Sequence, residues 1–321
     1  MKTRVLAVPE GLEPAAELLA GGELVALPTE TVYGLGAAAL DPIACAKIFE
    51  VKERPLSDPL IVHLPDSQWL DQLARPNGLA IRLANEFWPG PLTLVLPRQN
   101  SVPDLVTAGQ TTVALRMSAH PVFAAVSRIY GQPIAAPSAN RFGRISPTSA
   151  SHVLTELGDR IPLIVDGGPC LHGIESTIVR VREHEVEILR HGPITKERLS
   201  EFVVVLPPRS GTVAPGSMQT HYAPQTPLIL SEELGAQLAG DERGDFPERT
   251  GFLLWSSRGE GLRFVEQLSG SQDLREAAAN LYGAMRRLDE AGLELIVAEP
   301  IPETGLGVAI MERLRKAAAR E

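Results

Sequence analysis

Short apolar runs alternate with segments of helical spacing along the first two thirds of the chain. Runs rich in Val, Ile and Leu predict strands at 24–28, 60–64, 92–97, 112–117, 133–136, 163–166, 177–182 and 186–190. Apolar residues three and four apart predict helices at 13–21, 41–50, 66–74, 77–87, 120–131, 148–157 and 195–201. Many strands at uneven spacing predict a twisted mixed α/β sheet, with a hairpin at 181–188.

The pattern is interrupted between residues 206 and 227, where prolines are frequent and no hydrophobic period is present. This composition is typical of an extended linker. Beyond it, a small parallel α/β module is indicated, with strands at 227–231, 250–255 and 293–298 and helices at 232–240, 271–290 and 305–319. We therefore expect a larger α/β domain, a linker and a smaller α/β domain, at 1–206, 207–226 and 227–321.

Composition argues against a nucleic-acid-binding protein and against a membrane-spanning protein. The chain has 321 residues, 44% of them hydrophobic and 21% charged, which is enough for a packed core. The net charge is −9, with an acidic excess in both parts, and this disfavours a protein that grips nucleic acid through many phosphates. No apolar run approaches the roughly 20 residues that span a bilayer. The absence of a signal-peptide pattern and the presence of only two cysteines favour a cytoplasmic location.

The stretch LPTETVYGLG, at 27–36, follows a predicted strand, and strand ends are common ligand sites in α/β proteins. Its glycines fit the spacing G-x-G-x-x-A at 34–39. In a dinucleotide-binding loop the glycines follow the strand directly and open a helix, whereas the next predicted helix begins only at Asp41. The sequence contains no Walker phosphate-loop motif either. The pattern therefore disfavours a Rossmann cofactor site here.

Three basic residues lie at positions where they could bind an anion. Lys52 and Arg54 leave the predicted helix 41–50 together and can turn toward one anion, although a solvated helix end is the conservative interpretation. Arg116 lies on an otherwise apolar strand, so it must reach the surface or pair with an anion. A ligand carboxylate would satisfy it. His63, within LIVHL, is by itself more typical of a satisfied core histidine.

Small polar groups follow two other strands. Ser138 and Asn140 stand beside arginines and Ser146, which indicates either an oxyanion or phosphate pocket or a simple turn. Ser176 lacks a nucleophile-elbow motif, so it is expected to hydrogen-bond a ligand rather than attack one. Cys170 and His172 have no second pair to complete a zinc site. These patterns favour a site that binds and orients anionic reactants.

Taken in order, seven motifs resemble those of YrdC-like proteins: PTETVYGLG, IFEVKERPLSDPLIVHL, WPGPLTLVL, TVALRMSAHP, PIAAPSAN, GGPCLHGIESTIV and ILRHGPI. The resemblance covers residues 10–200. The linker APGSMQTHYAP and the terminal TGLGVAIMERLRKA are similar to the long, two-domain form of the threonylcarbamoyl-AMP synthases.

This resemblance implies an ATP-dependent nucleotidyltransferase that converts L-threonine, bicarbonate and ATP to L-threonylcarbamoyl-AMP and pyrophosphate. A separate transferase machinery would pass the threonylcarbamoyl group to adenosine 37 of tRNAs that read ANN codons, while direct tRNA binding stays open. The family fold has a large concave cavity lined by positive charge. A Rossmann-like C-terminal domain follows a linker that crosses the cavity mouth.

By the same resemblance, the threonine pocket falls on Thr31, His63, Arg116, the backbone of Ala136, and Ser176. The ATP side falls on Lys52, Arg54, Asp58, Thr112, Ser138, Asn140, Ser146, Arg190 and Tyr222. Within that set, the family's signature quartet, expected to be catalytic, is Lys52, Arg54, Ser138 and Asn140. No protein metal site is implied, because Mg²⁺ would arrive bound to ATP. Gly34 and Gly36 are expected to let the chain turn closely past the cavity.

Two departures from the family pattern and two alternatives remain. Residues 217–220 offer no basic side chain, which puts a charge contact from the linker to ATP in doubt. Glu53 stands where a small or neutral residue is frequent, and we expect it to face outward. The alternatives are a non-catalytic RNA-binding module and an enzyme of the same fold that uses a carbamoyl donor other than threonine.

Overall fold

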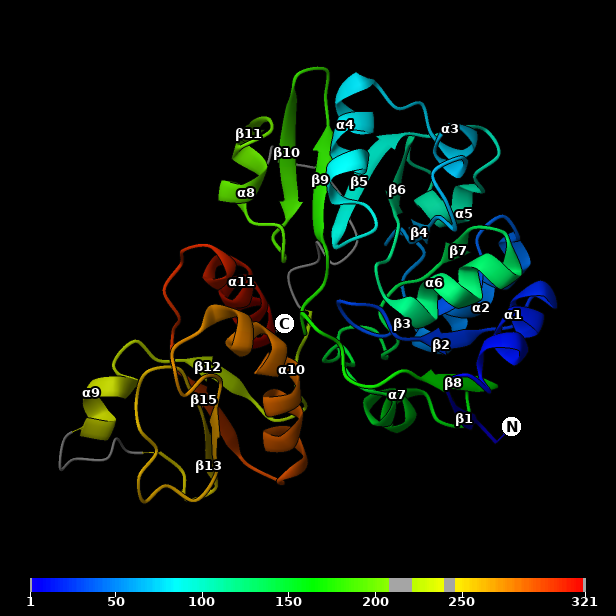
Figure 1. Cartoon of the computed structure of the whole chain (residues 1–321). Helices are drawn as coiled ribbons and strands as arrows, with labels where there is room; N and C mark the ends of the chain where they lie inside the picture. The colour runs from blue at the N-terminus through cyan, green and yellow to red at the C-terminus, as the bar shows by residue number, and fades with distance from the viewer. Residues whose placement is uncertain (1, 208–220, 240–245, 320–321) are drawn as a thin grey trace. The chain divides into compact units, whose positions relative to one another are not determined.

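The computed structural model describes residues 2–207, 221–239 and 246–319 (Figure 1). Two compact units are present. The first consists of Met1–Phe142, Pro147–Leu171 and Glu175–Ser217. The second consists of Gly143–Ser146, His172–Ile174 and Met218–Glu321. Two short loops from the first two thirds of the sequence therefore belong to the second unit.

The described part of the first unit contains one sheet of eleven strands, in the order β1-β8-β2-β3-β7-β4-β6-β5-β9-β10-β11. The strands are β1 (Arg4–Ala7), β2 (Val25–Leu27), β3 (Gly34–Ala38), β4 (Ile61–His63), β5 (Leu92–Pro97), β6 (Thr112–Arg116), β7 (Ile134–Ala135), β8 (Leu163–Asp166), β9 (Thr177–Val181), β10 (Glu185–Arg190) and β11 (Val204–Leu206). Parallel pairs such as β4–β6 and antiparallel pairs such as β5–β6 occur together. The predicted mixed sheet is confirmed, and so is the hairpin, which is the antiparallel pair β9–β10.

Helices cover this sheet. They are α1 (Leu12–Ala20), α2 (Pro42–Lys52), α3 (Trp69–Leu73), α4 (Gly78–Phe87), α5 (Asp104–Thr107), α6 (Pro121–Tyr130), α7 (Ala150–Leu157) and α8 (Lys196–Ser200). Along β2 the side chains alternate: Val25 and Leu27 pack in the cluster that holds α1 and α6, whereas Ala26 packs in the larger cluster that holds α2, α4 and α7. Helices α1 and α6 lie side by side in Figure 1.

The end of α2 turns two cations inward. Asp41 caps the helix, accepting a hydrogen bond from the backbone nitrogen of Ile43 at 2.8 Å. At the other end Glu53 adopts the left-handed conformation, with φ 56°. This turn leaves Glu53 exposed while Lys52 and Arg54, on either side of it, are buried. The expectation that Glu53 faces outward is confirmed.

The glycine-rich segment that was expected to turn is a strand, so that expectation was wrong. Gly34–Ala38 pairs antiparallel with β2 on one side and with β7 on the other. A β-carbon at Gly34 would lie 3.2 Å from the β-carbon of Ala136, and one at Gly36 would lie 3.1 Å from Ile134. The glycines therefore let a crowded central strand fit between its neighbours.

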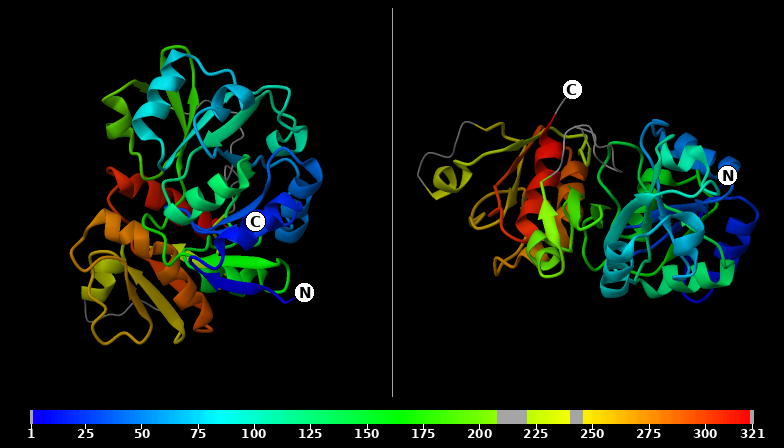
Figure 2. Two further views of the ribbon diagram at one scale, coloured as in Figure 1. Left: turned by 45° about the vertical axis from the view of Figure 1, so that its right-hand side comes forward. Right: turned by 90° about the horizontal axis from the view of Figure 1, so that it is seen from above.

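The second unit contains a four-stranded sheet, in the order β12-β15-β13-β14, with every described pair parallel. Its strands are β12 (Leu228–Leu230), β13 (Thr250–Leu254), β14 (Val265–Gln267) and β15 (Leu295–Ala298). Its helices are α9 (Leu234–Ala239), α10 (Leu274–Glu290) and α11 (Leu306–Ala318). Helices α10 and α11, orange and red in Figure 2, pack together against this sheet. The predicted parallel module is confirmed.

No helix in the described ranges combines the length and apolar character needed to cross a bilayer.

Candidate active site

Two predicted residues lie side by side on one face of the central sheet. In the parallel pair β4–β6, His63 stands opposite Arg116. Val62 and Leu115 point into the larger core, whereas Ile61 and Ala114 form a small cluster on the other face. Because side chains alternate along a strand, His63 and Arg116 share the face of Ile61 and Ala114.

Arg116 is buried, and its guanidinium group has several partners within the protein. One terminal nitrogen, Nη2, lies 2.6 Å from Oε1 of Glu30, and Nη1 donates to Oγ1 of Thr31 at 3.0 Å. The third nitrogen, Nε, donates to the carbonyl oxygen of Gly90 at 3.2 Å. The anion that a buried arginine requires is therefore supplied in part by the chain itself, through Glu30.

The second oxygen of Glu30 accepts a hydrogen bond from Oγ of Ser118 at 2.5 Å. Burial would raise the pKa of this carboxyl group, but the charge of Arg116 and the bond from Ser118 outweigh it and lower the pKa from 4.5 to about 2. Sequence reasoning missed Glu30 and Ser118. The available signal was the requirement for an acid beside a buried arginine, with Glu30 directly before Thr31 in the predicted strand-end loop.

His63 is buried and neutral. Burial first, and the nearby charge of Arg116 second, lower its pKa from 6.5 to about 3. Its ring packs on Phe123, with 4.6 Å between ring centroids. Among the described residues its Nδ1 atom has no hydrogen-bond partner. A buried polar atom of this kind is costly unless a ligand satisfies it, so His63 differs from the satisfied core histidine that its strand alone suggested.

Thr31 is held by its own loop. Oγ1 of Thr29 accepts hydrogen bonds from the backbone nitrogens of Thr31 and Val32 at 3.1 and 3.2 Å. The hydroxyl groups of Thr29 and Thr31 are 2.8 Å apart. Such side-chain to backbone bonds fix a tight turn. At the end of β7, the nitrogen of Ala136 donates to the carbonyl oxygen of Ile61 at 2.9 Å, which places Ala136 beside the strand of His63.

Ser176, predicted to bind threonine, and Arg190, predicted to bind ATP, contact one another. Nη2 of Arg190 donates to Oγ of Ser176 at 3.0 Å, and Nε donates to its carbonyl oxygen at 3.1 Å. Oγ1 of Thr93 lies 2.8 Å from the same hydroxyl group. All three residues are buried. Thr93 is a further contact that the sequence analysis did not identify.

Lys52 is fully buried at the end of α2. Its Nζ donates to the carbonyl oxygen of Ser138 at 2.6 Å and also to that of Asn140. Burial first, and the charge of Arg54 second, hold the pKa of Lys52 well below its usual value. The structure therefore brings together three of the four predicted catalytic residues, through backbone oxygens of the Ser138–Asn140 segment.

Arg54 is joined to Asp58. Their side chains form a buried ion pair, with 2.9 Å between Nη2 and Oδ2. Arg54 also donates to the carbonyl oxygens of Asp58 and Pro59, at 3.1 and 2.7 Å. Asp58, predicted on the ATP side, therefore orients Arg54. The 138–140 segment is fixed in turn by Tyr33, whose carbonyl oxygen accepts from the nitrogen of Ala139 at 2.8 Å.

The remaining predicted residues lie apart from these contacts. Thr112 begins β6 and is half-buried, opposite Pro97. Ser146 and Tyr222 belong to the second unit. There Tyr222 stacks on Tyr282 with 5.8 Å between ring centroids. Residues 217–220, which offered no basic side chain, lie outside the described residues.

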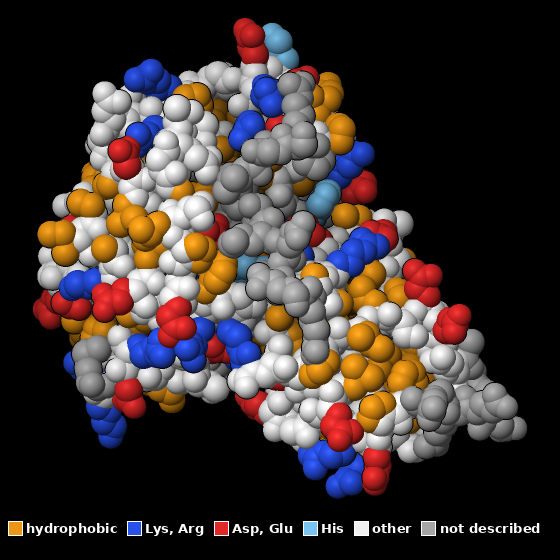
Figure 3. Space-filling model, turned by 180° about the vertical axis from the view of Figure 1, so that it is seen from behind, with side chains coloured by type: hydrophobic (Ala, Val, Ile, Leu, Met, Phe, Trp, Pro, Cys, Tyr) orange, Lys and Arg blue, Asp and Glu red, His pale blue; other side chains and the backbone are white. Residues whose placement is uncertain are grey.

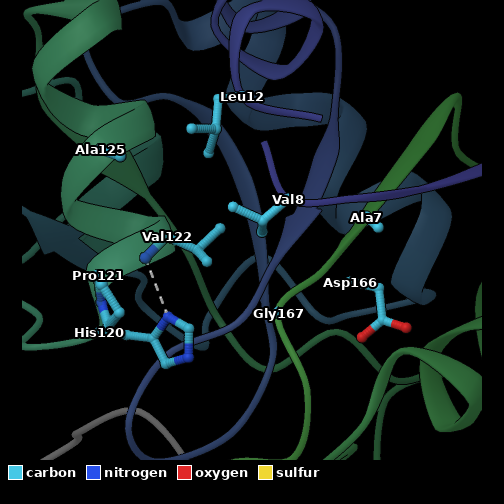
Figure 4. Close-up of a pocket in the computed structure, with 9 residues that line it drawn as sticks. All are labelled: Ala7, Val8, Leu12, His120, Pro121, Val122, Ala125, Asp166 and Gly167. Carbon is cyan, nitrogen blue, oxygen red and sulfur yellow. Dashed lines mark hydrogen bonds between the residues drawn. The ribbon is translucent and has the colours of Figure 1, made fainter. Parts of the chain in front are cut away.

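Charged side chains of both signs are interspersed on the face shown in Figure 3. A pocket of about 450 Å³ opens elsewhere on the first unit, lined by residues that include Val8, Leu12, His120 and Asp166 (Figure 4). In it, Nδ1 of His120 accepts a hydrogen bond from the nitrogen of Val122 at 3.2 Å. None of the predicted site residues is among the described residues that line this pocket.

Two family models match the chain, one after the other. One, described as "Telomere recombination" and named for Sua5, YciO and YrdC, matches residues 17–192. The chain belongs to the Sua5/YciO/YrdC family. The other model, the threonylcarbamoyl-AMP synthase C-terminal domain, matches residues 194–319. The resemblance read from the sequence motifs is thereby confirmed.

Relatives in this family are similar over nearly their whole length. The threonylcarbamoyl-AMP synthase of Bacillus subtilis is 42% identical, over 95% of this chain and 92% of its own. That of Pyrococcus abyssi is 40% identical, over 94% and 92%. A crystal structure of Pyrococcus abyssi Sua5 complexed with L-threonine matches with a TM-score of 0.87 at 37% identity, over 98% of both chains. The two-part α/β architecture is therefore that of the long family members.

Proposed function

We propose that this chain is an L-threonylcarbamoyladenylate synthase. It converts L-threonine, bicarbonate and ATP to L-threonylcarbamoyl-AMP, pyrophosphate and water. The observation that carries the proposal is the match to both family models in order, over residues 17–192 and 194–319. Relatives that bear the name of this enzyme extend over the same length.

Threonine binds, in this proposal, to Thr31, His63, Arg116, the backbone of Ala136, and Ser176. Arginine has five N–H donors in a planar fork. Glu30, Thr31 and Gly90 each occupy one of its nitrogens and fix the plane, as the described contacts indicate. The further donors suit the substrate carboxylate.

His63 supplies selectivity. Its neutral imidazole presents a buried Nδ1 atom without a partner in the described part of the chain. The threonine hydroxyl group can satisfy this atom, whereas valine, of nearly the same shape, cannot. A site built to hydrogen-bond a hydroxyl group rejects the analogue that lacks one by roughly 10⁴-fold or more.

ATP is bound by Lys52, Arg54, Asp58, Thr112, Ser138, Asn140, Ser146, Arg190 and Tyr222. Burial lowers the pKa of Lys52, and the negative charge of a phosphate group beside it would raise that pKa again. Lys52 and Arg54 then neutralise the charge that develops on the departing pyrophosphate, with Ser138 and Asn140 as hydrogen-bonding partners.

The reaction has two steps. The uncharged amine of threonine attacks the carbon of bicarbonate, and a C–O bond breaks to release water and leave a carbamate. Cations that line the pocket favour this anion. A carbamate oxygen then attacks the α-phosphorus of ATP, and the bond to pyrophosphate breaks. Holding the carbamate oxygen in line with that bond is a positioning task.

Mg²⁺ enters as the complex of ATP, since this hard cation binds through phosphate oxygens and a few protein groups. The described residues contain no group of three or more His, Cys, Asp or Glu side chains placed to hold a metal ion.

The product passes to a tRNA threonylcarbamoyl transferase machinery, and the enzyme works in the cytoplasm. Residues 1–206 act as the catalytic domain, 207–226 as a lid and 227–321 as the domain that anchors the lid.

Pyrophosphate release tests the proposal. The purified protein is incubated with ATP, Mg²⁺, bicarbonate and one amino acid at a time: threonine, serine or valine. We expect release that requires both threonine and bicarbonate and that valine does not support. Release with another amino acid and not with threonine would favour a different carbamoyl donor. Absence of release from folded protein that retains RNA binding would favour the non-catalytic alternative.

Deletion of residues 207–321 tests the lid. It should weaken turnover, and unchanged kinetics would show that residues 207–226 do not act as a lid.

A further inference from the structure

Helix α10 of the second unit buries an arginine and a carboxylate that core packing does not require. Its apolar face, which includes Ala278, Leu281 and Met285, is buried. Arg286 on the same helix is only 5% exposed, and the side chain of Asp289 is 13% exposed. A buried charge is costly unless it is paired or hydrogen-bonded. The hydrogen-bond partners of these two residues therefore show which segments the helix fixes in place.

Arg286 binds the 143–146 loop. Its Nη2 donates a hydrogen bond to the backbone oxygen of Ile145. Ile145 is 2% exposed, and Ser146 next to it is fully buried. Both belong to the second unit, although Asn140 stands only a few residues earlier in the chain. The loop that continues from the Ser138–Asn140 segment is thus packed as part of the α10 module.

Asp289 binds the segment that follows the linker. Its two oxygens accept hydrogen bonds from the backbone nitrogens of Gln225 and Thr226, at 3.0 and 2.7 Å. One of them lies 3.9 Å from Nη2 of Arg144. The nitrogen of Ala223 donates in turn to the oxygen of Gly143 at 2.8 Å. Asp289 therefore joins the linker exit and the 143–146 loop to one helix turn.

A second loop meets the same helix at a glycine. Gly173 has φ +69°, and a β-carbon there would lie 2.4 Å from the backbone oxygen of Ala278 and 2.5 Å from the α-carbon of Ala279. Backbone atoms cannot yield to such a clash, so only glycine fits. Gly173 lies in the 172–174 loop, which leads within two residues to Ser176.

We propose that α10 is a positioning element for both substrates, with Arg286 and Asp289 fixing the loop on the ATP side and Gly173 fixing the loop on the threonine side. The inference rests on the proposed function, and it adds residues outside the substrate pocket. None of these residues touches substrate. They act by setting the backbone that carries Asn140, Ser146 and Ser176, and a displacement of about 1 Å in such backbone can cost roughly 100-fold in rate.

The test compares two neighbouring arginines. Arg286→Met removes the bond to Ile145. Arg287→Met changes an exposed residue of the same helix, which pairs with Glu266 of β14. We expect Arg286→Met and Asp289→Asn to raise the KM for ATP by roughly tenfold or more while the KM for threonine stays within about twofold. Gly173→Ala should instead raise the KM for threonine more than the KM for ATP. Arg286→Lys, which keeps one donor, should restore part of the loss.

Hydrogen exchange separates this inference from the proposed function, because it needs no turnover. Without substrates, Arg286→Met should speed amide exchange at residues 143–146 and at Ala223, Gln225 and Thr226, and Arg287→Met should not. An inactive wild-type protein would contradict the proposed function alone. Wild-type exchange and wild-type KM values in Arg286→Met and Asp289→Asn, or equal changes in Arg287→Met, would overturn the positioning role.

Discussion

The carboxylate of Glu30 lies 2.6 Å from the guanidinium group of Arg116, and both side chains are almost fully buried. Glu30 comes from the loop after β2, and Arg116 ends β6. The pair joins that loop to the strand face that also carries His63. Arg116 is thereby held in one orientation before any ligand arrives, which lowers the entropy cost of binding a carboxylate.

Replacing Glu30 should destabilise the protein strongly. Glu30→Gln keeps the shape but leaves Arg116 as a buried cation without its anion, which costs about 3–5 kcal/mol. Denaturation at neutral pH measures the loss. The matched control is Glu23→Gln, because Glu23 pairs with Lys47 at the surface, with side chains 48% and 34% exposed, and such pairs contribute about 0–1 kcal/mol. Equal, small losses in both variants would contradict the role given to the buried pair.

Arg116→Lys should separate the two substrates. Lysine keeps the charge but loses the planar fork that binds a carboxylate through two bonds. A lost hydrogen bond to a charged group costs about 1.5–3 kcal/mol, or roughly 10- to 150-fold. We expect the KM for threonine to rise by this factor and the KM for ATP to change little. A larger effect on ATP would show that the pocket is assigned to the wrong substrate.

Stability should depend on His63 in mildly acidic solution. Its pKa is about 3 in the folded protein and 6.5 ordinarily, so the unfolded state takes up a proton first as the pH falls. The unfolding free energy therefore decreases as the pH falls below 6.5, by at most about 1.4 kcal/mol per pH unit for this group. His63→Gln should make the slope between pH 6.5 and 4.5 shallower. His120, whose pKa is also lowered by burial, contributes equally to both proteins. An unchanged slope in His63→Gln would refute the prediction.

Lys52→Met should reduce turnover and stability together. It leaves the backbone oxygens of Ser138 and Asn140 without their donor, at about 1–3 kcal/mol for each unsatisfied group. Loss of a preorganised cation at the departing pyrophosphate should lower kcat by roughly 100- to 1000-fold. Lys47→Met, on the same helix but partly exposed, is the control. Single-turnover adenylation measures the effect on turnover, and thermal unfolding measures the effect on stability. A wild-type kcat in Lys52→Met would show that Lys52 is not catalytic.

Every helix and strand that the sequence pattern named is present in the structure, and most of them bury apolar residues in the core. The pattern missed β1, whose Arg4 and Val5 are exposed, since an edge strand without buried alternation gives no periodic signal. It also missed β3. Glycine and alanine have low strand propensity, and only pairing with β2 and β7, where larger side chains do not fit, makes this segment a strand.

Within the site, residue types predicted the theme of cations and small hydroxyl groups, but not their partners. Glu30 was not identified as the partner of Arg116, because a loop carries no periodicity that would show its burial; the only signal was the need of a buried arginine for an acid. The assignment of the 143–146 loop to the second unit was also unpredictable, since it depends on long-range contacts such as Arg286 with Ile145. The roles of individual residues toward threonine and ATP stay predictions.

Transfer of carbon from bicarbonate to the adenylate distinguishes this enzyme from an amino-acid adenylating enzyme. The protein is incubated with ATP, Mg²⁺, L-threonine and ¹³C-bicarbonate, and the nucleotide products are analysed by mass spectrometry. We expect threonylcarbamoyl-AMP whose carbamoyl carbon carries the label, in an amount equal to the pyrophosphate released. Pyrophosphate release that forms unlabelled threonyl-AMP, or no adenylate of threonine at all, would contradict the proposed function.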